Sequence, residues 1–276
     1  MIKKTFFEKV VIVVLTILVF AFFMIPLYWL LITSLKYGRD AFTLPPQWLF
    51  FTPTLHNYVD ALTNAKTLMF IKNSLIITTG TTLLSLGLGV PAGYAIARTH
   101  WRLLNSSSFF FLILLMAPPV ATLIPFYLIM RDVHLLGTYW ALILLDTAFD
   151  ASFVVWMMRS YFKDVPQEIE EAALVDGASR FTAFLYVALP LSVPGIISSA
   201  LYCIIYSWND FLFALMLTSP TTKTIPLGIM ASFSAIGVSW GQMTTLSVFA
   251  IIPAVIISLF LNRYFVQGLT MGASKG

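Results

Sequence analysis

Polar side chains are rare in the long apolar stretches of this sequence, so the few that occur there are candidates for chemistry. Asp146 and Asp150 lie four residues apart in one stretch, and Asn209 and Asp210 are adjacent in another. A charge in the hydrocarbon core of a bilayer costs about 2.5–3.5 kcal/mol on insertion scales. These residues therefore indicate either a polar cavity or hydrogen bonds between packed helices, and the sequence leaves both interpretations open.

Aromatic side chains accompany the polar ones. At helical spacing the second stretch carries Tyr202, Tyr206, Asn209 and Phe213, with Trp208 and Asp210 beside them. Aromatic rings contact the C–H faces of a sugar or polyol, while amides and carboxylates bind its hydroxyl groups. The candidate residues of a transport path are Asp146, Asp150, Tyr206, Trp208, Asn209 and Asp210.

The composition shows what surrounds these groups. Of the 276 residues, 59% are hydrophobic and 10% are charged, and the mean hydropathy is +0.90. A soluble domain carries about 25% charged residues, so the composition excludes a soluble enzyme, a nucleic-acid-binding protein and a disordered chain. The net charge of +4 fits Lys and Arg on cytoplasmic loops. The single Cys203 excludes an intrachain disulfide framework and a multi-cysteine metal site.

Six segments are long and apolar enough to span a bilayer, which takes about 20 residues in a helix. They cover residues 10–35, 73–97, 107–130, 138–158, 192–217 and 243–262. The first is too long for the apolar region of a signal peptide, so we expect it to be retained as an anchor. Ten of the 16 Lys and Arg residues fall in the segments that are inside if the N-terminus is inside, which predicts cytoplasmic N- and C-termini.

Two of these segments carry packing signals. Ser85, Gly89, Gly93 and Ala97 recur every four residues, which forms a small-residue stripe that lets another helix approach closely. Three prolines, Pro118, Pro119 and Pro125, must kink or break the third segment. Closely packed and broken helices fit a transporter better than a passive anchor, although kinks in an ordinary membrane scaffold remain an alternative.

The segment 159–190 does not cross the membrane and has the pattern of two short helices. Asp164 is positioned to cap the first helix, with Gln167 at the capping-box position, and Gly177 to end it. Ser179 is positioned to cap the second. The first helix has an apolar edge beside an acidic one, which suits docking in a groove of a partner protein. A connector lying on the lipid headgroups is the alternative, although an acidic helix suits an anionic leaflet poorly.

The same segment carries a recognisable motif. Glu171-Ala172-Ala173 is followed after three residues by Gly177 and after nine more by Val187-Ala188-Leu189-Pro190. This spacing resembles the EAA signature of binding-protein-dependent ABC transporter permeases, with Val187 in place of Ile. The resemblance implies the type I importer permease fold, an all-α membrane protein with six transmembrane helices and a cytoplasmic coupling helix. It assigns ATPase coupling to Glu171, Ala172, Ala173, Gly177, Leu189 and Pro190.

Two further strings resemble the MalG-type permeases of the carbohydrate-uptake group. These are Trp208-Asn209-Asp210 and the end of the chain, residues 262–276. The resemblance implies that the tail contacts the ATPase through Gly268, Leu269, Thr270, Lys275 and Gly276. Small terminal residues are also typical of a frayed end, so that alternative stays open.

The sequence contains no Walker A pattern and no metal-ligand spacing, and His56, His100 and His134 lie in loops or near span ends. The resemblance implies one permease domain, residues 1–276, without catalytic residues or a bound cofactor. ATP and magnesium would bind to the ATPase. The implied partners are a second, MalF-type permease subunit, two ATPase subunits, an extracytoplasmic solute-binding protein and the lipid bilayer, with no nucleic acid.

The expected function is therefore the ATP-driven import of a carbohydrate by alternating access, in a bacterial or archaeal cytoplasmic membrane. In MalG-type subunits the loop that corresponds to residues 218–242 contacts the binding protein, whereas a plain interhelical loop is the alternative. Residues 36–72, rich in proline and aromatic residues, are expected to form an ordered cap. An ion-driven secondary transporter and a membrane-embedded enzyme or scaffold are the competing functions.

Overall fold

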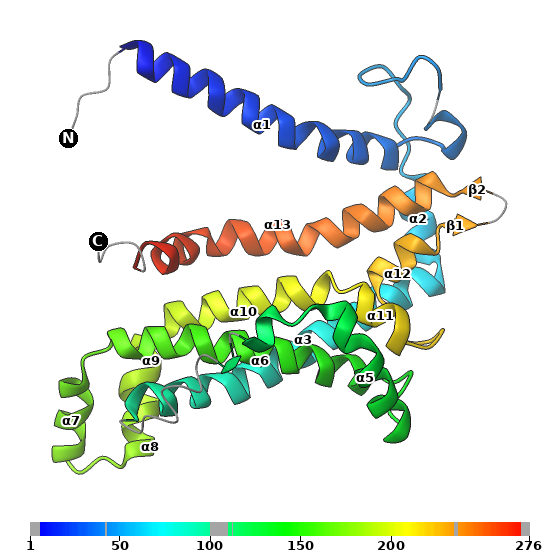
Figure 1. The fold of residues 1–276 in the computed structure, drawn as a ribbon. Helices are drawn as coiled ribbons and strands as arrows, with labels where there is room; N and C mark the ends of the chain where they lie inside the picture. Colours follow the sequence, from blue (N-terminus) through cyan, green and yellow to red (C-terminus); the bar gives the residue numbers. More distant parts are fainter. Residues whose placement is uncertain (1–5, 42, 100–109, 112, 235–236, 272–276) are drawn as a thin grey trace. The chain divides into compact units, whose positions relative to one another are not determined.

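The structure, a computed structural model, describes residues 6–41, 43–99, 110–111, 113–234 and 237–271, with side chains described up to residue 256. The described chain is predominantly helical, which confirms the predicted fold class (Figure 1). Its β structure is one antiparallel hairpin of two-residue strands, β1 (Phe233–Ser234) and β2 (Gly237–Val238).

The chain divides into two compact units. The first unit combines Met1–Leu68 with Gly228–Ile251, and the second combines Met69–Leu227 with Ile252–Gly276. Helices α3 (Ala65–Arg98), α12 (Ile225–Met230) and α13 (Trp240–Met271) run across the division. The expectation of one permease domain over residues 1–276 stays a prediction.

The first unit begins with α1 (Phe6–Ser34), whose apolar window has a mean hydropathy of 3.1 and no buried residues. A helix that is apolar all round and exposed in its own chain suits a lipid environment. The 3₁₀ turn η1 (Gly38–Asp40) and the helix α2 (His56–Thr63) follow.

The segment between α1 and α2 is held by two polar side chains. Lys36 is buried with its ammonium group 4.8 Å from the centre of the Trp29 ring and 4.9 Å from that of Phe51, and it donates a hydrogen bond to the carbonyl of Gln47. Burial lowers the pKa of Lys36. The amide nitrogen of Asn57 donates to the carbonyls of Ser34 and Lys36, at 2.8 and 2.7 Å. These contacts support the ordered cap that the sequence predicts for this segment.

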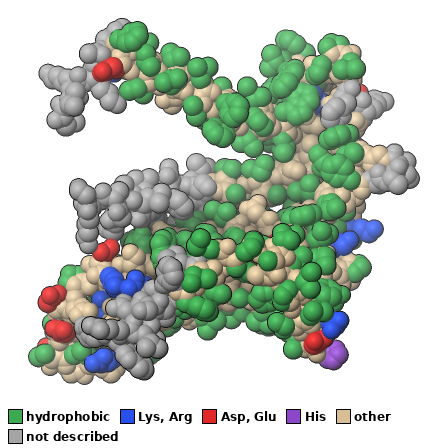
Figure 2. Space-filling model, in the orientation of Figure 1, with side chains coloured by type: hydrophobic (Ala, Val, Ile, Leu, Met, Phe, Trp, Pro, Cys, Tyr) green, Lys and Arg blue, Asp and Glu red, His purple; other side chains and the backbone are tan. Residues whose placement is uncertain are grey.

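The second unit is a helical bundle. Its helices are most of α3, α5 (Pro119–Asp132), α6 (Tyr139–Asp164), α7 (Gln167–Val175), α8 (Arg180–Ala183), the π-helical turn η2 (Phe184–Ala188), α9 (Leu189–Leu191), α10 (Val193–Trp208) and α11 (Leu212–Leu217). Helices α6 and α10 pack along each other, and α7 and α8 extend beyond them at one end (Figure 1). Hydrophobic side chains cover the visible face between the two ends of this unit, while charged side chains gather at the ends (Figure 2).

The predicted spans map onto the helices with some differences in extent. Helices α1, α3 and α6 are each long and apolar enough to cross a membrane. Residues 180–208 form a helix pair bent by 76°, and α10 alone covers most of the span predicted at 192–217. Part of the predicted span 107–130 lies outside the described residues, as do the side chains of α13 after residue 256.

The proline-rich segment is broken as expected. The helical residues 113–116 end before Ala117, and α5 begins at Pro119. Pro118 has extended backbone angles, φ −65° and ψ 125°. Proline is disfavoured inside a helix but is well suited to its first position. A new helix, α5, therefore begins at Pro119, directly after Pro118.

The small-residue stripe of α3 lies against α6, which confirms its predicted role. A Cβ atom at Gly89 would stand 2.7 Å from the side chain of Val154, and one at Gly93 would stand 3.0 Å from that of Met158. Ser85 and Ala97 at the two ends of the stripe are buried. The two helices are therefore close enough that even a methyl group is excluded from their contact.

This contact predicts opposite effects for two neighbouring glycines. We expect Gly89→Ala to lower the thermal stability of the purified protein, because overpacking a core contact costs about 1–3 kcal/mol. Among the described residues, Gly87 has no atom within 4 Å of its Cβ position, so Gly87→Ala should leave stability unchanged or raise it by about 0.5–1 kcal/mol through helix propensity. Thermal unfolding in detergent measures both, and equal effects of the two substitutions would contradict the contact.

Candidate functional site

Helix α7 ends in a turn that only its glycine makes without strain. Gly177 has φ +92°, the amide of Ala178 donates to the carbonyl of Ala173 at 3.0 Å, and that of Gly177 donates to the carbonyl of Leu174 at 3.1 Å. This pair of hydrogen bonds is the Schellman motif, which satisfies the last carbonyls of a helix. Ser179 then caps α8, since its hydroxyl accepts from the amide of Thr182 at 3.1 Å. The predictions that Gly177 ends the first short helix and that Ser179 caps the second are both confirmed.

The predicted start of α7 is wrong. Asp164 is the last residue of α6, and the residue that precedes α7 is Pro166, which offers no side-chain cap. Val165 between them has extended backbone angles, φ −79° and ψ 120°. A residue before proline is driven out of the helical region, so the break comes at Val165 and the acidic residue stays in the preceding helix.

The motif residues of α7 are largely available to a partner. Glu171 and Ala172 are exposed, and Ala173 is half-buried. Around them α7 and α8 expose apolar side chains of some size: Ile169, Val175 and Phe181 have relative exposures of 45%, 87% and 68%. In the second half of the motif, Leu189 is half-buried and Pro190 is exposed.

Glu170, next to the motif, is a buried anchor that sequence reasoning missed. Its Oε1 accepts from Nε of Arg98 at 2.9 Å and also pairs with Nη2 of that residue, while its Oε2 accepts from the Tyr94 hydroxyl at 2.7 Å. Arg98 also donates to the carbonyl of Val165 at 3.1 Å. No local signal separates Glu170 from Glu171, since only the tertiary contact with α3 decides which of the two is buried.

The candidate carboxylates of α6 are buried inside this chain. Asp146 and Asp150 both have 0% relative exposure. Asp146 accepts a hydrogen bond from the Ser207 hydroxyl on α10 at 2.9 Å. Neither oxygen of Asp150 has a hydrogen-bond partner among the described residues, although the thiol of Cys203 is nearby. The two carboxylates therefore share a face of α6 that is turned toward α10.

Three aromatic rings stack beside these carboxylates. Phe153 of α6 lies parallel to Tyr202 of α10, with ring centres 3.6 Å apart, and Tyr202 stacks on Tyr206 at 5.8 Å. All three rings are only partly buried, and Asn209 beyond them is exposed, with its amide donating to the carbonyl of Ile205 at 2.8 Å. This arrangement offers flat apolar surfaces with a polar group at one end.

The remaining residues of the predicted path, Trp208 and Asp210, have contacts within the chain. Trp208 is buried, and Asp210 accepts from the amides of Phe213 and Ala214 at 3.3 and 2.9 Å, which satisfies the first turn of α11. Phe213 is buried in the core and stacks on Phe149. The predicted helical spacing through Phe213 is therefore wrong, because α10 ends at Trp208 and α11 begins at Leu212.

The predicted tail is helical in its first part. Helix α13 continues to Met271, so Gly268, Leu269 and Thr270 lie within it, although their side chains are not described. Lys275 and Gly276 lie outside the described residues. No group of three metal-ligating side chains that could hold an ion occurs within the described ranges.

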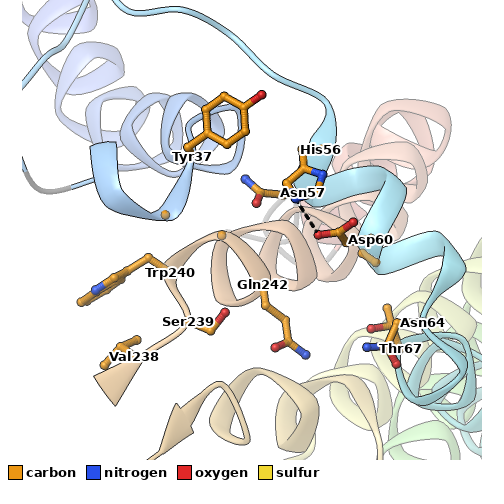
Figure 3. A pocket seen from close by; sticks show the side chains of 13 residues that line it. Tyr37, His56, Asn57, Asp60, Asn64, Thr67, Val238, Ser239, Trp240 and Gln242 are labelled. Atoms are coloured by element: carbon orange, nitrogen blue, oxygen red, sulfur yellow. Dashed lines mark ion pairs between the residues drawn. The ribbon is translucent and has the colours of Figure 1, made fainter. Parts of the chain in front are cut away.

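The first unit contains a polar cleft of about 750 Å³ between α2 and the start of α13 (Figure 3). His56 and Asp60 pair across one turn of α2 at 3.1 Å, and Asn64 continues this stripe. Ser239 and Gln242 line the opposite side, whereas the rings of Tyr37 and Trp240 point away from the stripe (Figure 3). The side chains do not converge on one point, which suits a docking surface better than a small-molecule site.

One glycine lining this cleft allows its two sides to approach each other. A Cβ atom at Gly241 would lie 2.4 Å from Oδ1 of Asn57, and Asn57 is itself fixed by two backbone carbonyls. The start of α13 can therefore approach α2 only because residue 241 has no side chain.

Comparison with known proteins shows to which family this chain belongs. Residues 89–271 match the family described as binding-protein-dependent transport system inner membrane component. This chain belongs to that family. It is an ABC importer permease, a transport subunit rather than an enzyme, and the EAA sequence on α7 is typical of such permeases.

Relatives extend the similarity over nearly the whole permease. It is 31% identical to the trehalose/maltose transport system permease protein MalG of Thermococcus litoralis over 99% of both chains. It is also 31% identical to the sulfoquinovosyl glycerol transport system permease protein SmoH of Agrobacterium fabrum, over 91% of this chain and 88% of that protein. A chain of a bacterial ABC transporter involved in the import of the acidic polysaccharide alginate has a TM-score of 0.78 and 22% identity, covering 95% of this permease and 99% of that chain. This last likeness shows that the fold is shared.

The hydrogen bonds of Asp210 predict a structural effect of its removal. Asp210→Ala should lower the stability of the permease by about 1 kcal/mol, because the first amides of α11 lose their acceptor. Asp210→Asn keeps one of the two acceptor oxygens, so it should lose less stability than Asp210→Ala. Thermal unfolding of both variants is the measurement, and a loss in Asp210→Asn as large as that in Asp210→Ala would contradict capping by the side-chain oxygens.

Proposed function

We propose that this permease forms part of an ATP-driven carbohydrate importer. In this proposal it works with a second permease subunit, two ATPase subunits and an extracytoplasmic solute-binding protein. ATP and magnesium bind to the ATPase subunits. The observation that carries the proposal is the exposed EAA helix α7, held between a proline joint and a glycine turn. The carbohydrate substrate is supported by the names of the two relatives that match most of the chain.

The proposed orientation follows from the distribution of Lys and Arg. Most of these residues lie near the N-terminus, at or just after the end of α3, in the segment that contains α7, or near the C-terminal end. Positive residues concentrate in cytoplasmic loops, so α7 and both termini are assigned to the cytoplasm. The cleft beside α2 and the loop after α11 are then assigned to the outer side.

Helix α7 would then dock in a groove of an ATPase subunit. Its exposed alanine, Ala172, allows close approach, Ile169 supplies apolar contact, and Glu171 supplies a charge for a basic partner residue. The end of α13 and the following tail residues are proposed as a second ATPase contact.

The stacked rings of Phe153, Tyr202 and Tyr206 are proposed to line the sugar path, with Asn209 at its end. A half-buried aromatic surface beside an exposed amide suits a saccharide that passes through without being tightly held. Asp146 and Asp150 lie behind the rings in the core, where they would support this wall without touching the sugar.

The outer loops are proposed to receive the solute-binding protein. Asn73 on α3 holds the loop after α11, since its amide donates to the carbonyls of Thr221 and Lys223 at 3.0 and 2.8 Å. The separate cleft beside α2 adds a polar cavity of about 750 Å³. Both are fixed by internal hydrogen bonds, which reduces the entropy lost on docking.

The experiment that tests the proposed function uses the complex reconstituted in proteoliposomes. Uptake of labelled saccharide should require ATP and the loaded binding protein, in a panel that contains neutral and acidic oligosaccharides. Wild-type complex that hydrolyses ATP without transporting any saccharide of the panel would overturn the carbohydrate assignment.

Two substitutions in the coupling segment test the role of α7. Glu171→Lys reverses a charge at the proposed ATPase contact, and Gly177→Ala places a side chain at φ +92°, where the cost is about 1–2 kcal/mol per residue. Both should reduce the stimulation of ATP hydrolysis by the loaded binding protein while membrane insertion is retained. Gly87, which has neither a positive φ nor an atom of the described residues within 4 Å of its Cβ position, provides the control Gly87→Ala. Full stimulation in Glu171→Lys would exclude this contact.

Cysteine labelling tests the proposed path. In a Cys203→Ser background, Asn209→Cys should react with a membrane-impermeant thiol reagent in the ATP-trapped complex and less in the resting complex. Asp150→Cys should stay unlabelled in both states, because position 150 is enclosed by the chain. If Asp150→Cys were labelled as strongly as Asn209→Cys, the path would run past the carboxylates of α6 and not along the aromatic stack.

A further inference from the structure

The last turn of α3 holds the coupling segment through a compact polar cluster. This cluster, which we call the α3 clamp, consists of Tyr94, Arg98 and Glu170. Both oxygens of Glu170 are used, one by Arg98 and one by the hydroxyl of Tyr94. The side chains of Arg98 and Glu170 are 12% and 8% exposed. A pair this enclosed is held tightly, because separating it would leave a charge buried without a partner.

The clamp also reaches the joint that precedes α7. Arg98 donates to the carbonyl of Val165, the extended residue between α6 and α7. The ring of Tyr94 packs against Phe162 of α6 and Phe184 of the turn η2, with ring centres 5.2 and 4.7 Å away. One turn of α3 is thereby in contact with the segments on both sides of α7 and with α7 itself.

Helix α7 is connected to the chain at both ends by short joints. It is joined to α6 through Val165 and Pro166, and to α8 through Gly177 and Ala178, and neither joint is helical. Among the described residues of α7, Glu170 alone has a side chain that hydrogen-bonds to another helix. The clamp is therefore the side-chain hydrogen-bonded link between the described residues of α7 and the bundle, in addition to the packing of α7 against η2 and α8.

We propose that Tyr94, Arg98 and Glu170 are positioning residues that transmit displacement of α7 to α3. This inference rests on the proposed function, in which an ATPase subunit moves α7. A displacement of α7 acts on the end of a 34-residue helix. That helix is in turn locked to α6 at Gly89 and Gly93, so α3 and α6 move as one body.

The test uses the complete reconstituted complex with its binding protein and compares saccharide uptake per ATP hydrolysed. Glu170→Gln and Arg98→Gln should each lower this ratio about fivefold or more while the ATPase subunits still co-purify, since couplings of this kind are typically 5- to 150-fold. The double variant should be no worse than either single one, because both disrupt the same pair. Lys163→Gln, which removes an exposed charge from the end of α6, is the control and should retain the ratio.

A second readout separates transmission from a purely structural role. Spin labels introduced by Leu88→Cys on α3 and Val175→Cys on α7, both exposed positions, report the distance between the helices. With the clamp intact this distance should be the same in the nucleotide-free and ATP-trapped complexes. In the Glu170→Gln background it should differ between the two states.

The outcomes distinguish this inference from the proposed function. If the wild-type complex imports saccharide and Glu170→Gln has an unchanged uptake ratio, the clamp does not transmit motion and the inference is overturned. If Glu170→Gln fails to assemble, Tyr94→Phe, which removes one hydroxyl, decides by the same two readouts. If the wild-type complex shows no ATP-dependent saccharide uptake, the proposed function fails and the inference fails with it.

Discussion

The close contact between α3 and α6 is the constraint on which the second unit depends. It requires glycine at positions 89 and 93, because a Cβ atom at either would meet the side chain of Val154 or Met158 at 3.0 Å or less. The same approach brings the end of α3 to the end of α6, where Arg98 reaches Val165 and Glu170. The small residues in the middle of α3 thus position the charged residue at its end, Arg98. A membrane protein gains close backbone packing from such stripes, since the lipid supplies no hydrophobic driving force between helices.

This packing gives the second unit of the permease a rigid part, to which α7 is attached. The rigid part comprises α3, α6 and α10, which share a core cluster around Val154, Met158 and Cys203. The attached helix is α7, whose two joints to the chain are non-helical. In the proposed function, a rigid wall of helices carries the sugar path, while α7 contacts the ATPase. The buried ion pair between Arg98 and Glu170 keeps α7 at a fixed distance from α3, so that a displacement of α7 moves both helices.

Local patterns predicted the parts of this structure that are determined locally. The turn at Gly177, the cap by Ser179, the break at Pro118 and the stripe on α3 each depend on a few neighbouring residues, and the structure confirms them. The break between α10 and α11 was missed, because residues 209–211 contain neither proline nor glycine and the helical spacing continues through them. The burial of Glu170 and the capping by Asp210 depend on neighbours in three dimensions, which the spacing of residues does not reveal. Similarly, Asp164 has the side chain of a cap, but Pro166 moved the start of the helix beyond its reach.

The most direct test of the account is a cross-link from α7 to its proposed partner. A photo-reactive amino acid placed at the exposed position 172 is activated in membranes that contain the assembled complex, with the exposed position 88 of α3 as the control. The account predicts a product of this permease with an ATPase subunit from position 172, and no such product from position 88. Products with lipid alone from position 172, in a complex that still hydrolyses ATP, would contradict the claim that α7 is the coupling helix.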